Sequence, residues 1–598
     1  MQHLDTLLTQ SAIAGCKACF QVDVLASTIQ IQQTRKEFEG HRTIVVFPLT
    51  RVSKKSPEET GKQLGEWLME HEPLVVGFQI VKGFLNLSIS SVFWSEQLVS
   101  ALNVSEYGIA PLNSLPRVMV EYSSPNTNKP LHLGHLRNNF LGFSVAKILR
   151  AAGHEVIKVQ IINDRGIHIC KSMVAWKRYG NGETPESSGI KGDKLVGKYY
   201  VAFDVEYKKE IAVLISEGTP EDDAKKSAPI LLEAQNLLHQ WERGDAEVVE
   251  LWKKMNAWVY AGFEGTYSEM GVSFDKLYYE SDTYLLGKAQ VEKGLKNGVF
   301  FQKEDGSTWI DLSDEGLDEK LVLRKDGTSV YMTQDIGTAL MRYEEFPGLD
   351  RQIYTVGNEQ EYHFKVLFKI LSKLGIEGAE RNFHLSYGMV ELPEGKMKSR
   401  EGTVVDADDL LVEMAETAKR MASELGKIND LSEQEKATLF KQVGYGALKY
   451  FLLKVSPQKS MMFDPAASVD FIGNTGPFIQ FNFVRARSVL RKCIDEGIPT
   501  NIESVDASAW DESELRIIQQ ALNWPEIVQL AAAQYDPSVI ANHGYELTKA
   551  YSRWYQDHSV LKEPNEAKCT ARVALTQMYT RQIEAAMALL GIEMPERM

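Results

Sequence analysis

The stretch RVMVEYSSPNTNKPLHLGHLRNNFLGFSVAKILRAAGHEVIKVQII, residues 117–162, places a helical pattern between two apolar runs. Its ends, RVMVEY and EVIKVQII, are short and rich in Val and Ile, which predicts buried β-strands. A strand, a helix and a second strand in this order form the βαβ unit of a parallel sheet. The stretch therefore predicts an α/β domain with an open parallel sheet. The apolar face of its helix is formed by Leu141, Val145, Ile148 and Ala152.

The same alternation returns downstream after a long interruption. LVLR and SVYM flank the turn Asp326-Gly327 and predict a hairpin, and the helix TALMRY and the strands IYTV and HLSYGMV follow. The interruption, from about 183 to 300, is charged and has helical spacing. We therefore expect one α/β domain over 113–405 that carries a helical insertion at about 183–300.

The two ends of the chain have different patterns. Residues 1–112 mix helical periods with short strands (RTIVVF, LVVGFQIV, FLNLSI) and end at the turn-rich PLNSLP, which predicts a small α+β domain. Beyond Asp406 nearly every segment has helical spacing, which predicts an all-α domain over 406–598.

The bulk composition is that of a globular protein, with 44% hydrophobic and 25% charged residues. The net charge of −15 argues against indiscriminate binding of DNA and other polyanions, although it permits a local basic patch. The N-terminus MQHLDTLLTQ lacks a basic stretch followed by an apolar run, and no apolar segment approaches the ~20 residues of a membrane span. We therefore expect a cytoplasmic protein without a membrane partner.

The cysteines do not indicate a metal centre. There are five, and only Cys16 and Cys19, in CKAC, are closely spaced. A zinc site needs a second CxxC or HxxxH half, which the sequence lacks. We expect CKAC to lie in a helix and no structural metal to be bound.

The loop PNTNKPLHLGH, from Pro125 to His135, follows the first predicted strand, where parallel sheets bind ligands. His132 and His135 can donate hydrogen bonds to phosphate oxygens, and a helix N-terminus favours anions. Gly134 has no Cβ and would let adenine or ribose approach the backbone. The alternative is that both histidines only cap the helix.

HLGH resembles the HIGH motif of class I aminoacyl-tRNA synthetases, and KMKSR, residues 396–400, resembles their KMSKS loop. Alone, KMKSR would be an ordinary basic loop. Lysines on such a loop can close over a triphosphate and neutralise its charge as pyrophosphate leaves. The resemblance implies a Rossmann-type catalytic domain that takes ATP with Mg²⁺ as a substrate. The implied ATP-binding residues are Pro125, His132, Gly134, His135, Lys396, Lys398 and Ser399, and the implied catalytic residues are His132, His135, Lys129 and Lys396.

One position departs from the motif, because Ser399 stands where KMSKS usually has its second lysine. Many arginyl-tRNA synthetases share this departure and resemble one another in a lysine just before the HIGH element, here Lys129. Its ammonium could stabilise the phosphates from the opposite wall. Lys398 is the competing candidate, and Lys129 as a solvated loop lysine is the third alternative.

The surroundings of both motifs resemble arginyl-tRNA synthetases in particular. The similar blocks are VEYSSPNTNKPLHLGHLRNN, SVYMTQDIGTAL, VGNEQEYHF, GMVELPEGKMKSR, NTGPFIQF and GIEMPERM. The resemblance implies an arginine-tRNA ligase that forms arginyl adenylate from L-arginine and ATP and transfers arginine to tRNA(Arg). It also implies a monomer and a requirement for bound tRNA before arginine is activated.

The arginine side chain is a planar cation with five donors, so its pocket needs carboxylates placed for forked hydrogen bonds. By resemblance, Glu121 and Asp335 bind the guanidinium and Tyr331 lines its pocket. The resemblance gives the orientation of the amino and carboxylate groups to Asn126, His132 and Gln360. Taken singly, Glu121 could be an exposed strand residue, Tyr331 a core aromatic and Asp335 an acid of a first helical turn.

Both terminal domains resemble the RNA-contacting parts of this family. Phe84 and Asn86 match the positions that contact the corner of tRNA, where an aromatic ring can stack on a base and an amide can bind its edge. Phe84 could instead belong to the core. Arg485 and Arg487 lie on the densest basic helix, which could contact tRNA or could be a solvated face.

Three rival interpretations are disfavoured. The first is another class I synthetase, but a cysteinyl enzyme should carry a Cys/His zinc set, and a large branched-chain enzyme should carry a longer insertion. A smaller nucleotidyltransferase would not need the helical residues after Asp406. A non-catalytic RNA-binding paralogue should have lost HLGH or the lysine loop.

Overall fold

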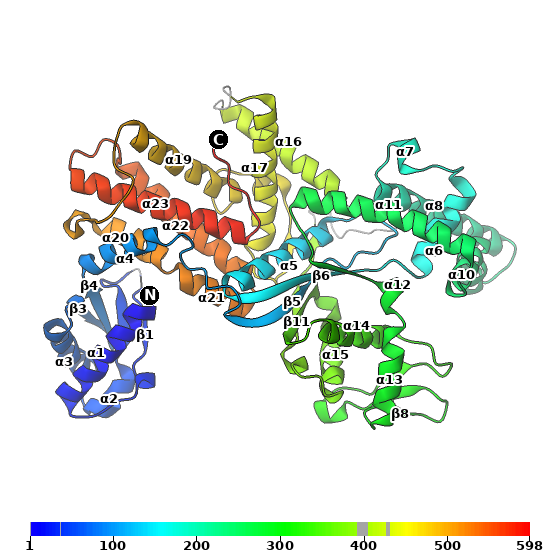
Figure 1. Cartoon of the computed structure of the whole chain (residues 1–598), viewed down its shortest axis with the longest axis horizontal. Coiled ribbons are helices and arrows are strands. Elements are labelled where there is room, and N and C mark those ends of the chain that lie inside the picture. The colour runs from blue at the N-terminus through cyan, green and yellow to red at the C-terminus, as the bar shows by residue number, and fades with distance from the viewer. Residues whose placement is uncertain (1, 36, 392–404, 426–430) are drawn as a thin grey trace.

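A five-stranded parallel sheet lies at the centre of the computed structural model, which describes residues 2–35, 37–391, 405–425 and 431–598 (Figure 1). All neighbouring strand pairs in this sheet are parallel. The first strand lies in the middle, so the chain extends the sheet first on one side and later on the other. This switch point predicts a ligand site at the carboxyl ends of the central strands. In spatial order the strands are β12 (Phe383–Tyr387), β11 (Leu349–Gly357), β5 (Leu115–Glu121), β6 (His154–Ile162) and β7 (Lys276–Tyr279).

Helix α5 (Leu133–Ala151) joins β5 to β6, as the sequence predicts. The four apolar residues predicted for its face are buried. Gly142 allows the helix to approach the sheet, because an added Cβ would lie 2.3 Å from the Cβ of Tyr122. On the other side of β5, α14 (Tyr331–Glu345) precedes β11 and α15 (Glu361–Lys373) follows it.

The helical segment that interrupts the sheet is shorter than expected. The sequence predicts helices to about residue 300, but the last long helix ends at Met270 and Lys276–Tyr279 pairs with β6. Four residues are too few to show a strand period, which is why the pattern missed β7. The helices are α6 (Ile167–Tyr179), α7 (Pro185–Ser188), α8 (Gly192–Ser216), α9 (Glu221–Ser227), α10 (Pro229–Glu242) and α11 (Ala246–Met270), with the short α12 (Glu280–Thr283) after β7.

A small antiparallel sheet precedes α14. It consists of β8 (Phe301–Gln302), β9 (Thr308–Ile310) and β10 (Lys320–Leu323), and α13 (Leu286–Lys296) comes before it. The expected hairpin partner SVYM is wrong as a strand, because only Ser329 bridges to Leu323 and a helix begins at Tyr331. The Thr333 hydroxyl accepts a hydrogen bond from the Val330 N–H at 3.0 Å, which caps this helix early.

The N-terminal domain packs helices on a four-stranded antiparallel sheet of order β1-β2-β4-β3. CKAC lies in its first helix, as expected. Helix α3 begins with a capping box between Ser56 and Glu59. The elements are α1 (Gln2–Phe20), β1 (Ile31–Gln33), β2 (Arg42–Val45), α2 (Phe47–Ser53), α3 (Pro57–His71), β3 (Val75–Val81), β4 (Phe84–Ile89) and α4 (Ser91–Asn103).

The C-terminal part is helical except for the short strand β14 (Met461–Met462), which pairs with β13 (Val390–Glu391). Figure 1 shows α4 beside α20, and the Trp510 indole donates to the Ser95 hydroxyl at 2.7 Å, so this part also holds the end of the N-terminal domain. Among the described residues, no helix has the length and apolar character needed to cross a membrane. The helices are α16 (Ala407–Leu425), α17 (Glu433–Leu453), α18 (Pro465–Ser468), α19 (Gly476–Asp495), α20 (Glu512–Leu522), α21 (Trp524–Gln534), α22 (Pro537–Asp557) and α23 (Glu566–Leu589).

Candidate active site

The two histidines of HLGH cap the N-terminus of α5 reciprocally. Nδ1 of His132 accepts from the Gly134 N–H at 3.2 Å, and Nδ1 of His135 accepts from the His132 N–H at 3.1 Å. Burial, followed by the charge of Lys129, lowers the pKa of His132 to about 4. Burial also lowers the pKa of His135 well below its ordinary value, with smaller contributions from His132 and Lys129. Both rings are therefore neutral near pH 7, and because Nδ1 is an acceptor the proton lies on Nε2. Both histidines therefore cap the helix, and this cap leaves the Nε2–H of each ring as a hydrogen-bond donor whose direction is fixed.

The loop before these histidines is held by the end of β6. The Asn163 N–H donates to the Pro125 carbonyl at 2.9 Å, and its side-chain amide donates to the Ser124 carbonyl at 3.2 Å. Gly134 leaves space for its neighbour, because an added Cβ would make a tight contact of 3.1 Å with Cε1 of His132. The glycine thus makes room for the His132 ring in this structure.

Lys129 lies within Coulomb range of HLGH, because it lowers the pKa of both histidines. Lys396, Lys398 and Ser399 lie outside the described residues. The segments on either side of 392–404 both lie against α5. On one side, the Arg137 guanidinium of α5 donates to the carbonyls of Pro457 and Lys459. These two residues lie in the loop before β14, the strand that pairs with β13. On the other side, the Ala407 N–H donates to the Leu131 carbonyl at 2.9 Å.

Carboxylates gather at the carboxyl ends of β5, β7 and β11. Glu121 ends β5 and is buried, and its Oε2 lies 2.5 Å from the Arg342 guanidinium of α14. Asp335, also on α14, pairs with Nε2 of His363 at 2.6 Å. Burial raises the pKa of Tyr354, and the charges of Arg342, Glu121 and Asp335 all act on its hydroxyl. Glu121 and Asp335, the two predicted guanidinium ligands, therefore lie near each other around Tyr354. The alternative interpretation of Glu121 as an exposed strand residue is wrong, because Glu121 is buried.

The other residues predicted for this pocket are more exposed. Tyr331 is the first residue of α14, is 80% exposed, and stands one turn before Asp335. It is therefore not a core aromatic. Asn126 is exposed on the loop that bridges to Asn163, and Gln360 is exposed directly after β11.

Glu280, at the carboxyl end of β7, was missed by the sequence analysis. Its pKa is raised to about 7 by burial first; Arg165 opposes this rise, and Asp164 and Asp335 add to it. Asp164 holds the start of α12 in place by accepting from the N–H and hydroxyl of Ser281 at 2.9 and 2.7 Å. Recognition of KLYY as a sheet strand would have placed this carboxylate beside the site.

The predicted RNA contacts of the N-terminal domain differ in exposure. Phe84 is partly buried and packs edge-to-face on the exposed Phe47, with ring centroids 5.7 Å apart. Asn86 is only 2% exposed, and its Oδ1 accepts from the Thr43 hydroxyl at 2.7 Å. The expectation that Asn86 presents its amide at the surface is therefore wrong for this structure. Asn86 lies on the same face of β4 as Phe84, opposite the core residues Leu85 and Leu87, and its hydrogen bond with Thr43 joins β4 to β2.

The two predicted arginines of α19 also differ. Arg487 is exposed, whereas Arg485 is partly buried and donates to the Ser552 hydroxyl at 3.1 Å. The Arg485 guanidinium lies 4.7 Å from the centroid of the Tyr555 ring. Arg487 is thus the more accessible of the two cations.

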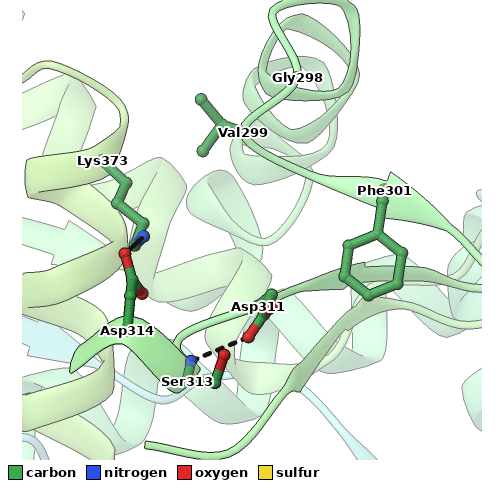
Figure 2. Close-up of a pocket in the computed structure, with 7 residues that line it drawn as sticks. All are labelled: Gly298, Val299, Phe301, Asp311, Ser313, Asp314 and Lys373. Atoms are coloured by element: carbon green, nitrogen blue, oxygen red, sulfur yellow. Dashed lines mark hydrogen bonds and ion pairs between the residues drawn. The ribbon is translucent and has the colours of Figure 1, made fainter. Parts of the chain in front are cut away.

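Two other features lie away from these residues. One is a hollow of about 510 Å³ that no predicted site residue lines, and Lys373 pairs there with Asp314 at 2.7 Å. Figure 2 shows this pair. In the described part of the chain, Asp511, Glu514 and His558 come close enough to share a metal ion. Asp511 and Glu514, however, form a helix-capping box, and Glu514 pairs with Arg572 at 3.0 Å.

Comparison with known proteins agrees with this geometry. Residues 98–464 match the family described as tRNA synthetases class I (R), catalytic domain, and residues 479–598 match the DALR anticodon binding domain. Arginine--tRNA ligase of Bacteroides fragilis is 54% identical, with all of both chains covered. That of Flavobacterium psychrophilum is 53% identical, over 96% of this chain and 97% of the relative.

Solved structures show the same likeness. Arginyl-tRNA synthetase of Thermus thermophilus has a TM-score of 0.79 at 25% identity, with all of both chains covered. The Plasmodium falciparum enzyme, at 18% identity over 100% of this chain and 99% of that one, shares the fold with a TM-score of 0.74. With a family match over most of the chain and full-length relatives above half identity, this chain belongs to the arginyl-tRNA synthetases of class I.

Proposed function

We propose residue roles for the arginine-tRNA ligase reaction, in which ATP activates L-arginine and the terminal adenosine of tRNA(Arg) then accepts it. One observation carries the proposal: two fixed Nε2–H donors at the start of α5 and the carboxylates of Glu121 and Asp335 lie at the same edge of the sheet. Anion and cation sites thus share one edge of the sheet, as ATP and arginine require.

His132 and His135 bind ATP phosphate oxygens through Nε2–H, together with the amide groups at the start of α5. Pro125 and Gly134 shape the loop against which the nucleoside lies. Lys396, Lys398 and Ser399 are proposed from the motif alone, to hold the triphosphate. Mg²⁺ enters as part of the Mg-ATP substrate and is bound through its phosphate oxygens.

Asp335 is the principal partner of the substrate guanidinium, because its carboxylate is the more exposed of the two predicted acids. Glu280 and Glu121 add negative charge from the ends of β7 and β5. Tyr331 covers the guanidinium, and Asn126, His132 and Gln360 orient the α-amino and carboxylate groups of the substrate.

Activation joins an arginine carboxylate oxygen to the α-phosphorus of ATP and breaks the bond from that phosphorus to the bridging oxygen of pyrophosphate. In the second step the 2′-hydroxyl of the terminal adenosine attacks the carbonyl of the adenylate, and AMP leaves. Neither step needs a strong base, so positioning and stabilisation of phosphoryl charge supply most of the catalysis.

The tRNA contacts are proposed at both ends of the chain. Phe84 stacks on a base of the tRNA corner, with Asn86 supporting its strand, and Arg487 and Arg485 contact the anticodon arm. The proposed domains are 1–112, 113–405 and 406–598, with the helical insertion ending at Met270. We further propose a monomer that works in the cytoplasm.

Pyrophosphate exchange tests these roles. Exchange should depend on arginine and on added tRNA, and it should remain absent with lysine or glutamate. His132→Gln should lower the exchange rate at saturating arginine, while Tyr331→Ala should raise mainly the arginine requirement. A variant pattern in which His132→Gln alters only arginine affinity would contradict the phosphate role of that histidine.

A further inference from the structure

An arginine of the protein itself lies behind the proposed arginine pocket. Arg342 stands two turns after Asp335 on α14, and its side chain is 1% exposed. Its NH2 nitrogen lies 2.5 Å from Oε2 of Glu121. The guanidinium also lies 4.8 Å from the ring centroid of Tyr278 and 5.9 Å from that of Tyr354. Among the described residues neither its Nε nor its NH2 nitrogen has a partner with hydrogen-bond geometry, so the contact with Glu121 is a close ion pair.

Glu121 needs this partner because its side chain is only 9% exposed. A carboxylate buried to that degree without a paired cation is strongly destabilising. Arg342 is the cation in contact with it, and the Arg342 pKa is itself raised by Glu121 against the opposing effect of burial. The other titratable groups around the pair are Tyr278 of β7, Tyr354 of β11, Asp335 and Glu345 of α14, Glu280 of α12 and His363 of α15.

The substrate brings one positive charge to a pocket with several carboxylates. Arg342 engages Oε2 of Glu121, so the incoming guanidinium meets Asp335, Glu280 and the other oxygen of Glu121. No hydrogen bond from the described residues reaches Oε1 of Glu121, which leaves this oxygen as an acceptor for the amino acid.

We propose that Arg342 is a positioning residue for the amino-acid pocket: it holds the Glu121 carboxylate in one orientation, and so sets the affinity for arginine without contacting the substrate. The proposal rests on the proposed role of Glu121 in binding arginine.

The test measures the arginine KM and kcat of Arg342→Met and Arg342→Lys at pH 7, at saturating ATP and tRNA. Arg342→Met should raise KM at least tenfold relative to the unaltered enzyme. The kcat at saturating arginine should change far less than KM, because Arg342 does not contact the reacting groups. Arg342→Lys should retain most of the affinity, because it keeps a cation in place.

A second background separates positioning from general damage. In Glu121→Gln enzyme, Arg342→Met should leave the arginine KM unchanged, because the group it serves is gone. If the single variant does not fold, this Gln/Met pair still decides the matter, since two neutral side chains can replace a buried ion pair at little cost in stability. Arg572→Met is the matched control: it breaks another buried pair, with Glu514, and should leave the arginine KM unchanged.

Two failures are distinguishable. An unchanged arginine KM in Glu121→Gln would remove the proposed role of Glu121 itself. A raised KM in Glu121→Gln, with Arg342→Met adding the same factor in both backgrounds, would overturn the positioning role of Arg342 alone.

Discussion

Asp335→Asn is the sharpest test of the arginine pocket. The substitution keeps the size of the side chain but removes the charge that the substrate guanidinium requires. In this structure the carboxylate already holds one partner, since Oδ2 lies 2.6 Å from Nε2 of His363. Its other oxygen is available to one N–H of a guanidinium, so the substitution removes one charge-assisted hydrogen bond.

Such a bond contributes about 1.5 to 3 kcal/mol. The Asp335 side chain is 41% exposed, so solvent screens the interaction and the lower half of that range applies. About 1.5 to 2 kcal/mol corresponds to roughly a tenfold to thirtyfold rise in the arginine KM. The KM for ATP should change by less than about threefold, because the proposed phosphate site is at the start of α5 rather than on α14.

Steady-state arginylation at saturating ATP and tRNA measures both constants. Asp314→Asn provides a matched control, because Asp314 is also paired, with Lys373, and lies in the hollow of Figure 2 away from the predicted site residues. It should leave both constants unchanged. Equal changes in the arginine and ATP constants of Asp335→Asn, or an arginine KM within threefold of the unaltered enzyme, would refute the assignment.

Three further outcomes are expected. Lys129→Ala should lower single-turnover adenylate formation about a hundredfold, or about 2.7 kcal/mol, while Lys398→Ala costs much less; a near-normal rate for the Lys129 variant would exclude its compensating role. Phe84→Ala should weaken tRNA binding by the ~1 to 3 kcal/mol of a lost base stack without a change in melting temperature, whereas a large fall in melting temperature would identify Phe84 as core. The carboxyl of Glu280, whose pKa is raised to about 7, should make the arginine KM fall as pH rises from 6 to 8, because the ionised form attracts the guanidinium; Glu280→Gln should remove this dependence, and a slope that persists would assign it to another group.

The sequence predicted the elements whose period is long enough to read. Helix α5 has 19 residues and a clear apolar face, and its flanking strands have seven and nine. The failures lie in short elements. β7 has four residues, and SVYM has the β-branched content of a strand yet starts α14, because the Thr333 hydroxyl caps the helix at Val330. The residue types of SVYM alone do not predict that this cap forms.

Site residues were predictable where a motif carried them and were missed where only the fold brings them together. His132 and His135 follow from HLGH, but the choice of Nε2 as donor depends on backbone hydrogen bonds that only the structure supplies. Arg342 and Glu121 are 221 positions apart in the chain and meet because α14 packs against the ends of β5 and β7. Asn86 was predicted as a surface contact but is buried. The alternation of FLNLSI does not reveal that its side-chain amide is hydrogen-bonded to Thr43.

Helix α5 connects the ATP loop to the anticodon-binding domain. Near its C-terminal end the Ser144 hydroxyl donates to the Leu589 carbonyl at 2.9 Å, and the Lys147 ammonium donates to the Ala588 carbonyl at 3.0 Å. The end of α23 is thus capped by side chains of the same helix that carries His132 and His135 at its other end. A helix moves as a rigid element, so a displacement of α23 would reach the first turn of α5 through these two hydrogen bonds. The family resemblance implies a requirement for bound tRNA, and if these contacts carry it, tRNA binding should alter the surroundings of His132 and His135.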